Sequence, residues 1–378
     1  MTPRSEGSTR PIMITGASSG IGLELARIYA RQGKPLVLIA RNEERLDATA
    51  TELRNLHAAY ISDNATGPAV AEITTVSLDV SDSGAIEEKL GEYVQTCGTP
   101  ELLINAAGVV NVGRFLEMDK DFFDANLRID LDGTVNVCRA IAPRMVDAGD
   151  GHIVNVASVA GFLGIYGYTG YASAKYAVMG FSEALRFEMK PLGVAVSVVC
   201  PPDTKTPGFA TEQAHRPPET EAIAGTIAPL DPAIVAKQIV SGINSRRFYI
   251  IIGATSNFYF RLKGLLPEVF LAIVDSDVRK AKNAGKKSVR TATAAPAIAA
   301  GTAPRTGLCA AAASNGHLQT YVLHDIVSPS ACLPEHNAMS RGGPQFPLTI
   351  TTACKRWGKN RRARFAAART TRTMLTCN

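Results

Sequence analysis

The chain has 378 residues, of which 46% are hydrophobic and 20% are charged, as in an ordinary globular protein. Its formal net charge of +6 is unevenly distributed. The last 95 residues contain 13 of the 40 Lys and Arg but only two of the 34 Asp and Glu, so the first 283 carry a net charge of −5. This excludes a basic nucleic-acid-binding fold for the main body, and we expect no nucleic-acid partner.

The cysteines and the N-terminal residues indicate a reducing compartment. None of the seven cysteines has CxxC spacing, so we expect no metal site, and their odd number in a long chain argues against a disulfide framework. Residues 1–10 are polar, unlike a secretory signal peptide, and no run reaches the roughly 18 apolar residues that a membrane-spanning helix needs. We therefore expect a cytoplasmic protein.

Short apolar, β-branched runs alternate with helical patterns over residues 1–255. The expected strands cover residues 11–15, 35–40, 73–79, 102–107, 152–158, 194–201 and 248–253. The expected helices cover residues 20–31, 42–57, 83–96, 119–146, 171–190 and 231–246. Strands that alternate with helices predict an α/β fold with a doubly wound parallel sheet and helices on both faces.

Two segments depart from this alternation. Residues 201–229 are rich in Pro, Thr and Glu and follow the carboxyl end of a strand, where ligands bind in such folds, so we predict a substrate-covering loop. Residues 256–283 form a further helical segment with an apolar stretch at 264–274. This stretch is too short to span a bilayer. It either packs on the protein or a partner subunit, or lies on a membrane surface.

The pattern is lost from residue 284 to the end. Residues 284–378 are rich in small and basic residues and show neither a repeat nor a strand–helix rhythm. This composition predicts a low-complexity, disordered basic tail. A basic tail can also bind anionic lipid or nucleic acid. The predicted division is therefore residues 1–255, 256–283 and 284–378.

A glycine-rich segment follows the first expected strand and opens the first helix. It reads TGASSGIG over residues 15–22. Glycines let the backbone approach a pyrophosphate, and the helix N-terminus offers free N–H groups and a positive potential. The strand before it and the helix after it favour a dinucleotide site over a plain tight turn. The residues expected to contact the cofactor are Gly16, Ser18, Ser19, Gly20, Ile21 and Gly22.

The end of the second expected strand indicates which dinucleotide binds. An acidic residue there would bond the ribose 2′-hydroxyl of NAD, whereas Arg suits the 2′-phosphate of NADP. The chain has Arg41 at this place and Arg45 one helical turn later. The alternative is that both are solvated residues at a helix start. We expect NADPH/NADP+ as the cofactor.

A third pattern carries acid–base chemistry. Tyr171 and Lys175 are four residues apart and share one face of a helix. A nearby ammonium stabilises phenolate, so it lowers the Tyr pKa and lets the side chain exchange a proton with an alkoxide near neutral pH. Ser158 lies at a strand end, where a hydroxyl can polarise a carbonyl. Without Ser158, the spacing of Tyr171 and Lys175 would also fit a surface pair.

Together these motifs resemble the short-chain dehydrogenase/reductase family over roughly residues 10–253. The glycine segment, the Asn105-Ala-Ala-Gly108 strand end, Ser158 and Tyr171-x-x-x-Lys175 carry the resemblance. It implies a single Rossmann-type domain and a homo-oligomer. It also implies Tyr171 as acid/base, Lys175 as the group that lowers the Tyr171 pKa and holds the nicotinamide ribose, and Ser158 as the group that orients the carbonyl.

The same resemblance assigns two further residues and a subfamily. Asn105 would line the cofactor and Asp79 would sit by the adenine. GIYGYTGY at 164–171, PPDTKTPGFA at 201–210 and the expected helix at 232–240 are similar to 3-ketodihydrosphingosine (3-dehydrosphinganine) reductases. That similarity implies NADPH-dependent reduction of the 3-keto group of a long-chain sphingoid base to sphinganine, in sphingolipid synthesis.

The subfamily resemblance bears on location and leaves other substrates open. Residues 256–283 are similar to the membrane-associated C-terminal region of that subfamily, whereas we expect no counterpart of its eukaryotic N-terminal anchor. This implies peripheral contact with a membrane, the endoplasmic reticulum in a eukaryote. The alternatives are reductases of another apolar ketone: a steroid, a retinoid or a 3-oxoacyl thioester.

One position departs from the family pattern. The family usually has Asn in an Asn-x-x-Gly segment, thought to hold a water in a proton relay to the lysine, whereas this chain reads Asp130-Leu-Asp-Gly133. An ionised Asp130 accepts hydrogen bonds but cannot donate them, and its charge would compete for Lys175 and raise the Tyr171 pKa. Asn126, one turn earlier, is a candidate substitute. We expect reduced or pH-shifted activity; the alternative is a cofactor-binding protein with impaired catalysis.

Overall fold

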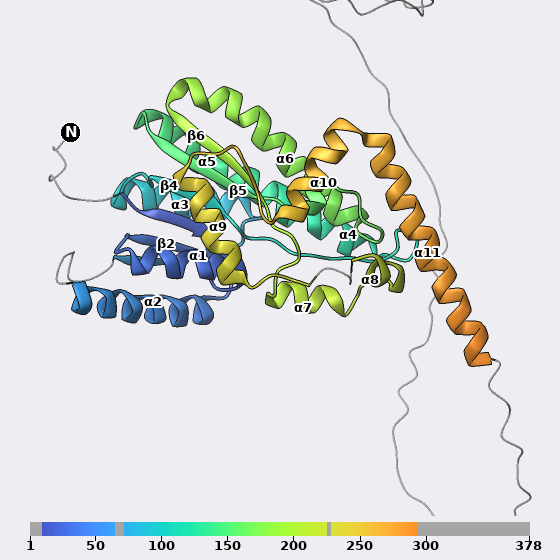
Figure 1. The fold of residues 1–378 in the computed structure, drawn as a ribbon. Coiled ribbons are helices and arrows are strands. Elements are labelled where there is room, and N and C mark those ends of the chain that lie inside the picture. The colour runs from blue at the N-terminus through green and yellow to red at the C-terminus, as the bar shows by residue number, and fades with distance from the viewer. Residues whose placement is uncertain (1–9, 65–71, 225–227, 294–378) are drawn as a thin grey trace, which may run out of the picture. The chain divides into compact units, whose positions relative to one another are not determined.

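The computed structural model describes residues 10–64, 72–224 and 228–293. Its strands form one parallel sheet in the order β3-β2-β1-β4-β5-β6-β7 (Figure 1). The strands are β1 (Ile12–Thr15), β2 (Leu36–Ala40), β3 (Ile73–Ser77), β4 (Leu102–Asn105), β5 (Gly151–Val156), β6 (Val194–Cys200) and β7 (Tyr249–Ile251). Each strand begins and ends within two residues of its expected position. The predicted doubly wound parallel sheet is therefore confirmed.

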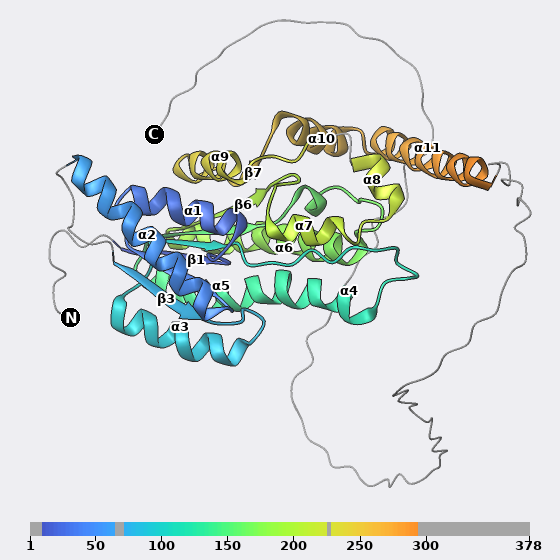
Figure 2. The same ribbon diagram turned by 90° about the horizontal axis from the view of Figure 1, so that it is seen from below.

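Helices cover both faces of the sheet, as Figure 2 shows. One face carries α1 (Gly20–Arg31), α2 (Glu43–Asn64) and α9 (Pro232–Asn244). The other carries α3 (Ser83–Cys97), α5 (Gly133–Asp147) and α6 (Thr169–Met189). Because successive strand residues point to opposite faces, Leu36 and Leu38 pack under the first group while Val37 and Ile39 pack under the second. This two-sided burial explains why the strands are almost wholly apolar.

The helical pattern over residues 119–146 is interrupted, so the prediction of one regular helix there was wrong. The chain forms α4 (Lys120–Asn126), a π-helical turn at Leu127–Asp132, and then α5. The Thr134 hydroxyl donates to the Asp130 carbonyl at 2.7 Å, and a side chain that bonds a carbonyl four residues back bends a helix. The π turn carries Asp130.

The segment after β6 is more regular than expected. In place of the loop expected at 201–229, the chain forms two short helices, α7 (Pro207–Gln213) and α8 (Pro218–Ala224). The Thr206 hydroxyl accepts from the Phe209 N–H at 3.2 Å, and Pro207 occupies the first turn. A Thr N-cap followed by Pro is a helix-start signal that composition alone obscured.

Two helices follow β7. They are α10 (Ala254–Leu265) and α11 (Pro267–Thr293), and α11 contacts both α8 and α10. Residues 284–293, expected to belong to the disordered tail, continue α11. No helix in the part of the chain that the structure describes is long and apolar enough to cross a membrane. The rest of the expected tail, 294–378, lies outside the described residues.

Candidate active site

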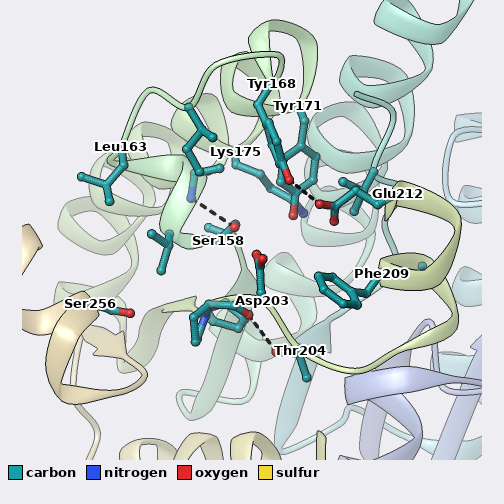
Figure 3. Close-up of a pocket in the computed structure, with 18 of the residues that line it drawn as sticks. Ser158, Leu163, Tyr168, Tyr171, Lys175, Asp203, Thr204, Phe209, Glu212 and Ser256 are labelled. Carbon is teal, nitrogen blue, oxygen red and sulfur yellow. Dashed lines mark hydrogen bonds between the residues drawn. The ribbon is translucent and has the colours of Figure 1, made fainter. Parts of the chain in front are cut away.

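The site lies at the carboxyl edge of the sheet, where the strand order reverses. The chain passes from β1 outward to β2 and β3 and then returns to β4 beside β1, so the loops after β1 and β4 diverge. A cavity of about 650 Å³ opens there. Its wall comes from the chain after β1, β4, β5 and β6, together with α10 and α11. Figure 3 shows part of this wall.

The glycine-rich segment brings bare backbone to one side of the cavity. Gly16 and Gly20 have positive φ values of 68° and 56°. A Cβ on Gly22 would lie 2.4 Å from the Gly16 carbonyl oxygen, so a larger residue would push the loop apart. The Ser19 side chain makes no capping bond to α1, which leaves the first-turn N–H groups for an anion. This backbone fits the pyrophosphate of a dinucleotide.

Most of the residues expected to contact a cofactor lie around this loop. The cavity is lined by Gly16, Ser19, Gly20, Ile21 and Gly22. Ser18 belongs to the same loop but does not line the cavity.

The residues expected at the adenosine end lie together beyond the ends of β2 and β3. The Arg41 guanidinium is 3.8 Å from the Asp79 carboxylate, and both side chains are partly exposed. Burial opposes ionisation of Asp79, but hydrogen bonds from Ser81 and the charge of Arg41 bring its pKa below the ordinary value. Arg45 lies exposed in the first turn of α2. The residue after β2 is thus an exposed arginine, whereas NAD-specific sites typically have an acidic residue there.

Ser158, Tyr171 and Lys175 line the same cavity. Ser158 precedes a single 3-10 turn after β5, and its hydroxyl accepts from the Ala160 N–H at 3.1 Å. Tyr171 and Lys175 lie on α6 and are 9% and 5% exposed. The Lys175 ammonium is 5.5 Å from the centre of the Tyr171 ring and donates to the Val156 carbonyl at 3.2 Å. A hydroxyl, a phenol and an ammonium thus converge.

Asp130 is buried beside Lys175. One carboxylate oxygen accepts from the Val109 N–H at 2.8 Å. The other is 3.6 Å from the Lys175 ammonium, beyond hydrogen-bond distance, and has no hydrogen-bond partner among the described residues. Burial raises the pKa of Asp130 to about 6, although Lys175 and the Val109 N–H oppose the shift. The protein therefore keeps an incompletely compensated carboxylate next to Lys175.

The pKa of Tyr171 lies above its ordinary value. Burial is the largest cause, the negative charge of Asp130 adds to it, and a hydrogen bond with Ser158 acts the other way. The expected net lowering by Lys175 was therefore wrong, because burial disfavours phenolate and Asp130 lies beside the same ammonium. The expected opposing effect of Asp130 is present.

The side chain of Asn126, the candidate substitute for the family asparagine, is hydrogen-bonded within the protein. Its side-chain oxygen accepts from the Asn111 N–H, and its amide donates to the Asn111 and Phe122 carbonyls. Through these hydrogen bonds, the Asn126 side chain holds the loop after β4 against α4. The alternative that Asn126 replaces the function of residue 130 stays a prediction.

Asn105 lies below the cavity and does not line it, contrary to expectation. Its amide donates to the Asn155 side-chain oxygen at 2.9 Å and to the Cys138 sulfur at 3.3 Å. These bonds join β4, β5 and α5 in the core. Thr15 supports the loop above instead, because its hydroxyl accepts from the N–H groups of Ala106 and Ala107, both at 3.1 Å.

A group of charged residues on the cavity wall was not anticipated. The Tyr168 hydroxyl donates to Glu212, the Arg216 Nε donates to the same carboxylate at 2.7 Å, and the Arg216 Nη2 donates to Asp203 at 2.6 Å. Two signals were present: Tyr168 is one helical turn before Tyr171, and Asp203 follows the carboxyl end of β6. The pairing with Arg216 depends on α7 and has no sequence signal.

The raised pKa of Asp130 predicts a pH-dependent stability. The folded protein binds this proton more tightly than the unfolded chain does, so the group lowers the free energy of unfolding as pH rises from about 4 to about 6. Above that range the ionised carboxylate costs stability. We expect Asp130→Asn to raise Tm at pH 7.5 by on the order of 3 °C, with the gain shrinking towards pH 4.

Thermal unfolding of both proteins across pH 4–8 tests this. Asp132→Asn is the matched control, because Asp132 lies in the same π turn but is exposed. Its Tm should follow that of the original protein at each pH. A lower Tm for Asp130→Asn at pH 7.5 would show that the charge of Asp130 stabilises the fold.

Comparison with known proteins identifies the family. The model of the short chain dehydrogenase family matches residues 10–217. A 3-ketodihydrosphingosine reductase of Bos taurus is 37% identical over 244 residues, which are 64% of this chain and 71% of that protein. A 3-dehydrosphinganine reductase of Danio rerio is 35% identical over 230 residues, 61% and 67% of the two chains.

A solved structure agrees with these sequence relatives. The short-chain dehydrogenase from Sphingobium yanoikuyae in complex with NADPH superposes with a TM-score of 0.55 at 26% identity, over 78% of this chain and 100% of that one. Three observations point to the same family. They are the fold shared with this structure, the sequence relatives, and the arrangement of the glycine loop with Ser158, Tyr171 and Lys175. The chain belongs to the short-chain dehydrogenase/reductase family of nicotinamide-dependent oxidoreductases.

Proposed function

We propose that the protein reduces 3-dehydrosphinganine to sphinganine with NADPH. The observation that carries the proposal is the convergence of Ser158, Tyr171 and Lys175 on one cavity beside the glycine loop. The named activity of the Bos taurus and Danio rerio relatives supports this choice of ketone. The catalytic domain would be residues 1–255.

In this reaction the side chains of Ser158, Tyr171 and Lys175 would bind the carbonyl oxygen and supply its proton. NADPH would supply the hydride to the C3 carbonyl carbon. The hydroxyls of Ser158 and Tyr171 would hold the carbonyl oxygen, and Tyr171 would give its proton to the oxygen as negative charge develops there. Lys175 would stabilise the remaining phenolate. A raised Tyr171 pKa keeps the phenol protonated and suits proton donation, but it slows the loss of that proton in the reverse oxidation.

The apolar part of the cavity supports a long-chain substrate. Leu163 and Ile165 line it after β5, Phe209 lines it from α7, and Tyr259 and Phe270 line it from α10 and α11. Burying an alkyl chain against such a wall contributes about 0.8 kcal/mol per methylene group. A small polar ketone would gain none of this energy.

Arg41 supports NADPH over NADH. It lies at the end of β2 with its side chain 63% exposed, so it is accessible to a 2′-phosphate. Arg45 lies one turn further on and would add a second cation. The complex of the Sphingobium yanoikuyae enzyme with NADPH agrees with this choice.

Location at a membrane surface has one supporting observation. The end of α10 and the start of α11 expose Leu265, Leu266, Val269 and Leu271, with exposed fractions between 48% and 79%. Apolar side chains on such helices favour the interface of a bilayer, where a lipid substrate resides. We propose a cytoplasmic enzyme in peripheral contact with a membrane, the endoplasmic reticulum in a eukaryote. Homo-oligomer formation remains an expectation from the family.

Asp130 favours a second candidate function, a cofactor-binding protein with impaired catalysis. Its charge acts on Lys175 and Tyr171, the two groups that move the proton. Under this alternative NADPH would bind without turnover of a ketone.

Replacing Tyr171 tests the proposed chemistry. Tyr171→Phe removes the proton donor but keeps the ring, so we expect kcat for 3-dehydrosphinganine to fall by about 10³-fold while NADPH still binds. NADPH oxidation in detergent micelles gives kcat, and the fluorescence of bound NADPH gives its affinity. Tyr176→Phe is the matched control, because Tyr176 lies on the same helix but outside the cavity, bonded to Lys263.

The outcomes separate the two candidate functions. NADPH binding without turnover in the original protein would favour the impaired protein. Full turnover in Tyr171→Phe would exclude Tyr171 as proton donor.

Replacing Arg41 tests the cofactor preference. Arg41→Ala removes a cation that would pair with the 2′-phosphate, so we expect the NADPH Kd to rise about tenfold and the NADH Kd to stay within about twofold. Titration of both cofactors measures this. Arg31→Ala, at the exposed end of α1, is the control. Equal weakening of NADPH and NADH would remove Arg41 as the basis of the preference.

A further inference from the structure

The charges on the cavity wall are unbalanced. Lys175 is the only basic side chain among the described lining residues, and it is paired with the buried Asp130. Three carboxylates line the same cavity: Asp203, Glu212 and Asp277. Asp277, on α11, is paired with Lys280 at 3.0 Å, whereas Asp203 and Glu212 share one cation, Arg216. Such a wall favours a cationic ligand over a neutral or anionic one.

Asp203 and Glu212 are held by Arg216 through one oxygen each. Arg216 is 3% exposed, and it contacts Oδ2 of Asp203 and Oε1 of Glu212. The Tyr168 hydroxyl donates to the same Oε1. Among the described residues, no hydrogen bond is made to Oδ1 of Asp203 or Oε2 of Glu212. One guanidinium therefore fixes two carboxylates and leaves each with an acceptor for a ligand.

These carboxylates lie beside the reacting groups. The Tyr168 ring packs against the Tyr171 ring, edge to face, with centroids 6.1 Å apart. Figure 3 shows Asp203 extending into the cavity and Glu212 at the hydroxyl of Tyr168. The charges of both carboxylates contribute to the raised pKa of Tyr171. The Asp203 side chain is 35% exposed, so it is the more accessible of the two.

We propose that Asp203 is the specificity residue of this enzyme and binds a protonated amine on the carbon next to the ketone. The inference rests on the proposed function, because 3-dehydrosphinganine is such an amino ketone. Ser158, Tyr171 and Asp203 line one cavity, so a ketone whose oxygen is held by Ser158 and Tyr171 would place an amine on the neighbouring carbon in the cavity that Asp203 enters. Glu212 adds negative charge, while Arg216 and Tyr168 hold the carboxylates in place. A steroid, a retinoid or a 3-oxoacyl thioester has no cation to offer at this position.

Matched ketones test the proposal on the full-length protein. The probes are 3-dehydrosphinganine and the same 1-hydroxy-3-ketone with hydrogen in place of the 2-amino group, each in detergent micelles at a pH where the amine is protonated. A hydrogen bond to a charged group is worth at least a factor of about ten, so we expect kcat/KM to be at least tenfold higher for the amino ketone. Asp203→Asn should reduce this preference to about twofold or less.

Asp203→Asn removes one of the carboxylates around Arg216, so the control is a variant that removes another one outside the cavity. Glu221 also lies near Arg216, with Nη1 3.7 Å from its carboxylate, but it is 59% exposed and does not line the cavity. Glu221→Gln should keep the preference of the original protein. NADPH affinity and Tm of each variant show whether the fold and the cofactor site are intact.

The outcomes distinguish this inference from the proposed function. Turnover of both ketones with equal kcat/KM overturns the role of Asp203 and leaves the reductase standing. An equal fall for both ketones in Asp203→Asn also overturns it, because Asp203 then only supports the fold through Arg216. Turnover of neither ketone removes the proposed function, and the inference with it.

Discussion

The buried ammonium of Lys175 is the charge on which the rest of the site depends. It is 3.2 Å from the Val156 carbonyl at the end of β5, 3.6 Å from Asp130 in the π turn, and 5.5 Å from the centre of the Tyr171 ring. One side chain thus links the sheet, the helix that precedes α5, and the phenol. Because a buried charge must be compensated, any change in one of these partners acts on the others.

Asp130 adds a second buried charge to this group of side chains. An amide at this position would accept from the Val109 N–H equally well and carry no charge. The carboxylate instead adds a negative charge that burial opposes, and it raises the pKa of Tyr171. The proposed direction of the reaction, in which Tyr171 gives a proton away, tolerates this better than the reverse oxidation does. The substitution therefore fits a reductase more readily than a dehydrogenase.

The strands and the main motifs were predictable, because each depends on local sequence. Apolar runs mark strands that are buried on both faces, and Tyr171 and Lys175 share a helix face at any tertiary arrangement. The π turn was not predictable. It holds one residue more than an α-helical turn, and the spacing of apolar residues in the sequence does not reveal that extra residue. The position of Asn105 below the cavity, and the pairing of Arg216 with Asp203 and Glu212, depend on how separate elements pack.

The elements after β6 line a large part of the cavity. Asp203, Phe209 and Glu212 come from the segment between β6 and α9, and Tyr259 and Phe270 come from α10 and α11. The glycine loop after β1, Ser158 after β5, and Tyr171 and Lys175 on α6 form the other side of this cavity. These later elements supply an apolar wall and a negative wall in one cavity. In the proposed function they would hold the alkyl chain and the amine of the same molecule.

Isotope transfer tests the central claim most directly. The full-length protein would be incubated with 3-dehydrosphinganine and NADPH that carries deuterium at the transferable position, and the lipid product analysed by mass spectrometry. The account predicts sphinganine with a single deuterium, on C3, and no labelled product from Tyr171→Phe over the same time. Unlabelled lipid recovered unchanged, under conditions where NADPH is bound, would contradict it.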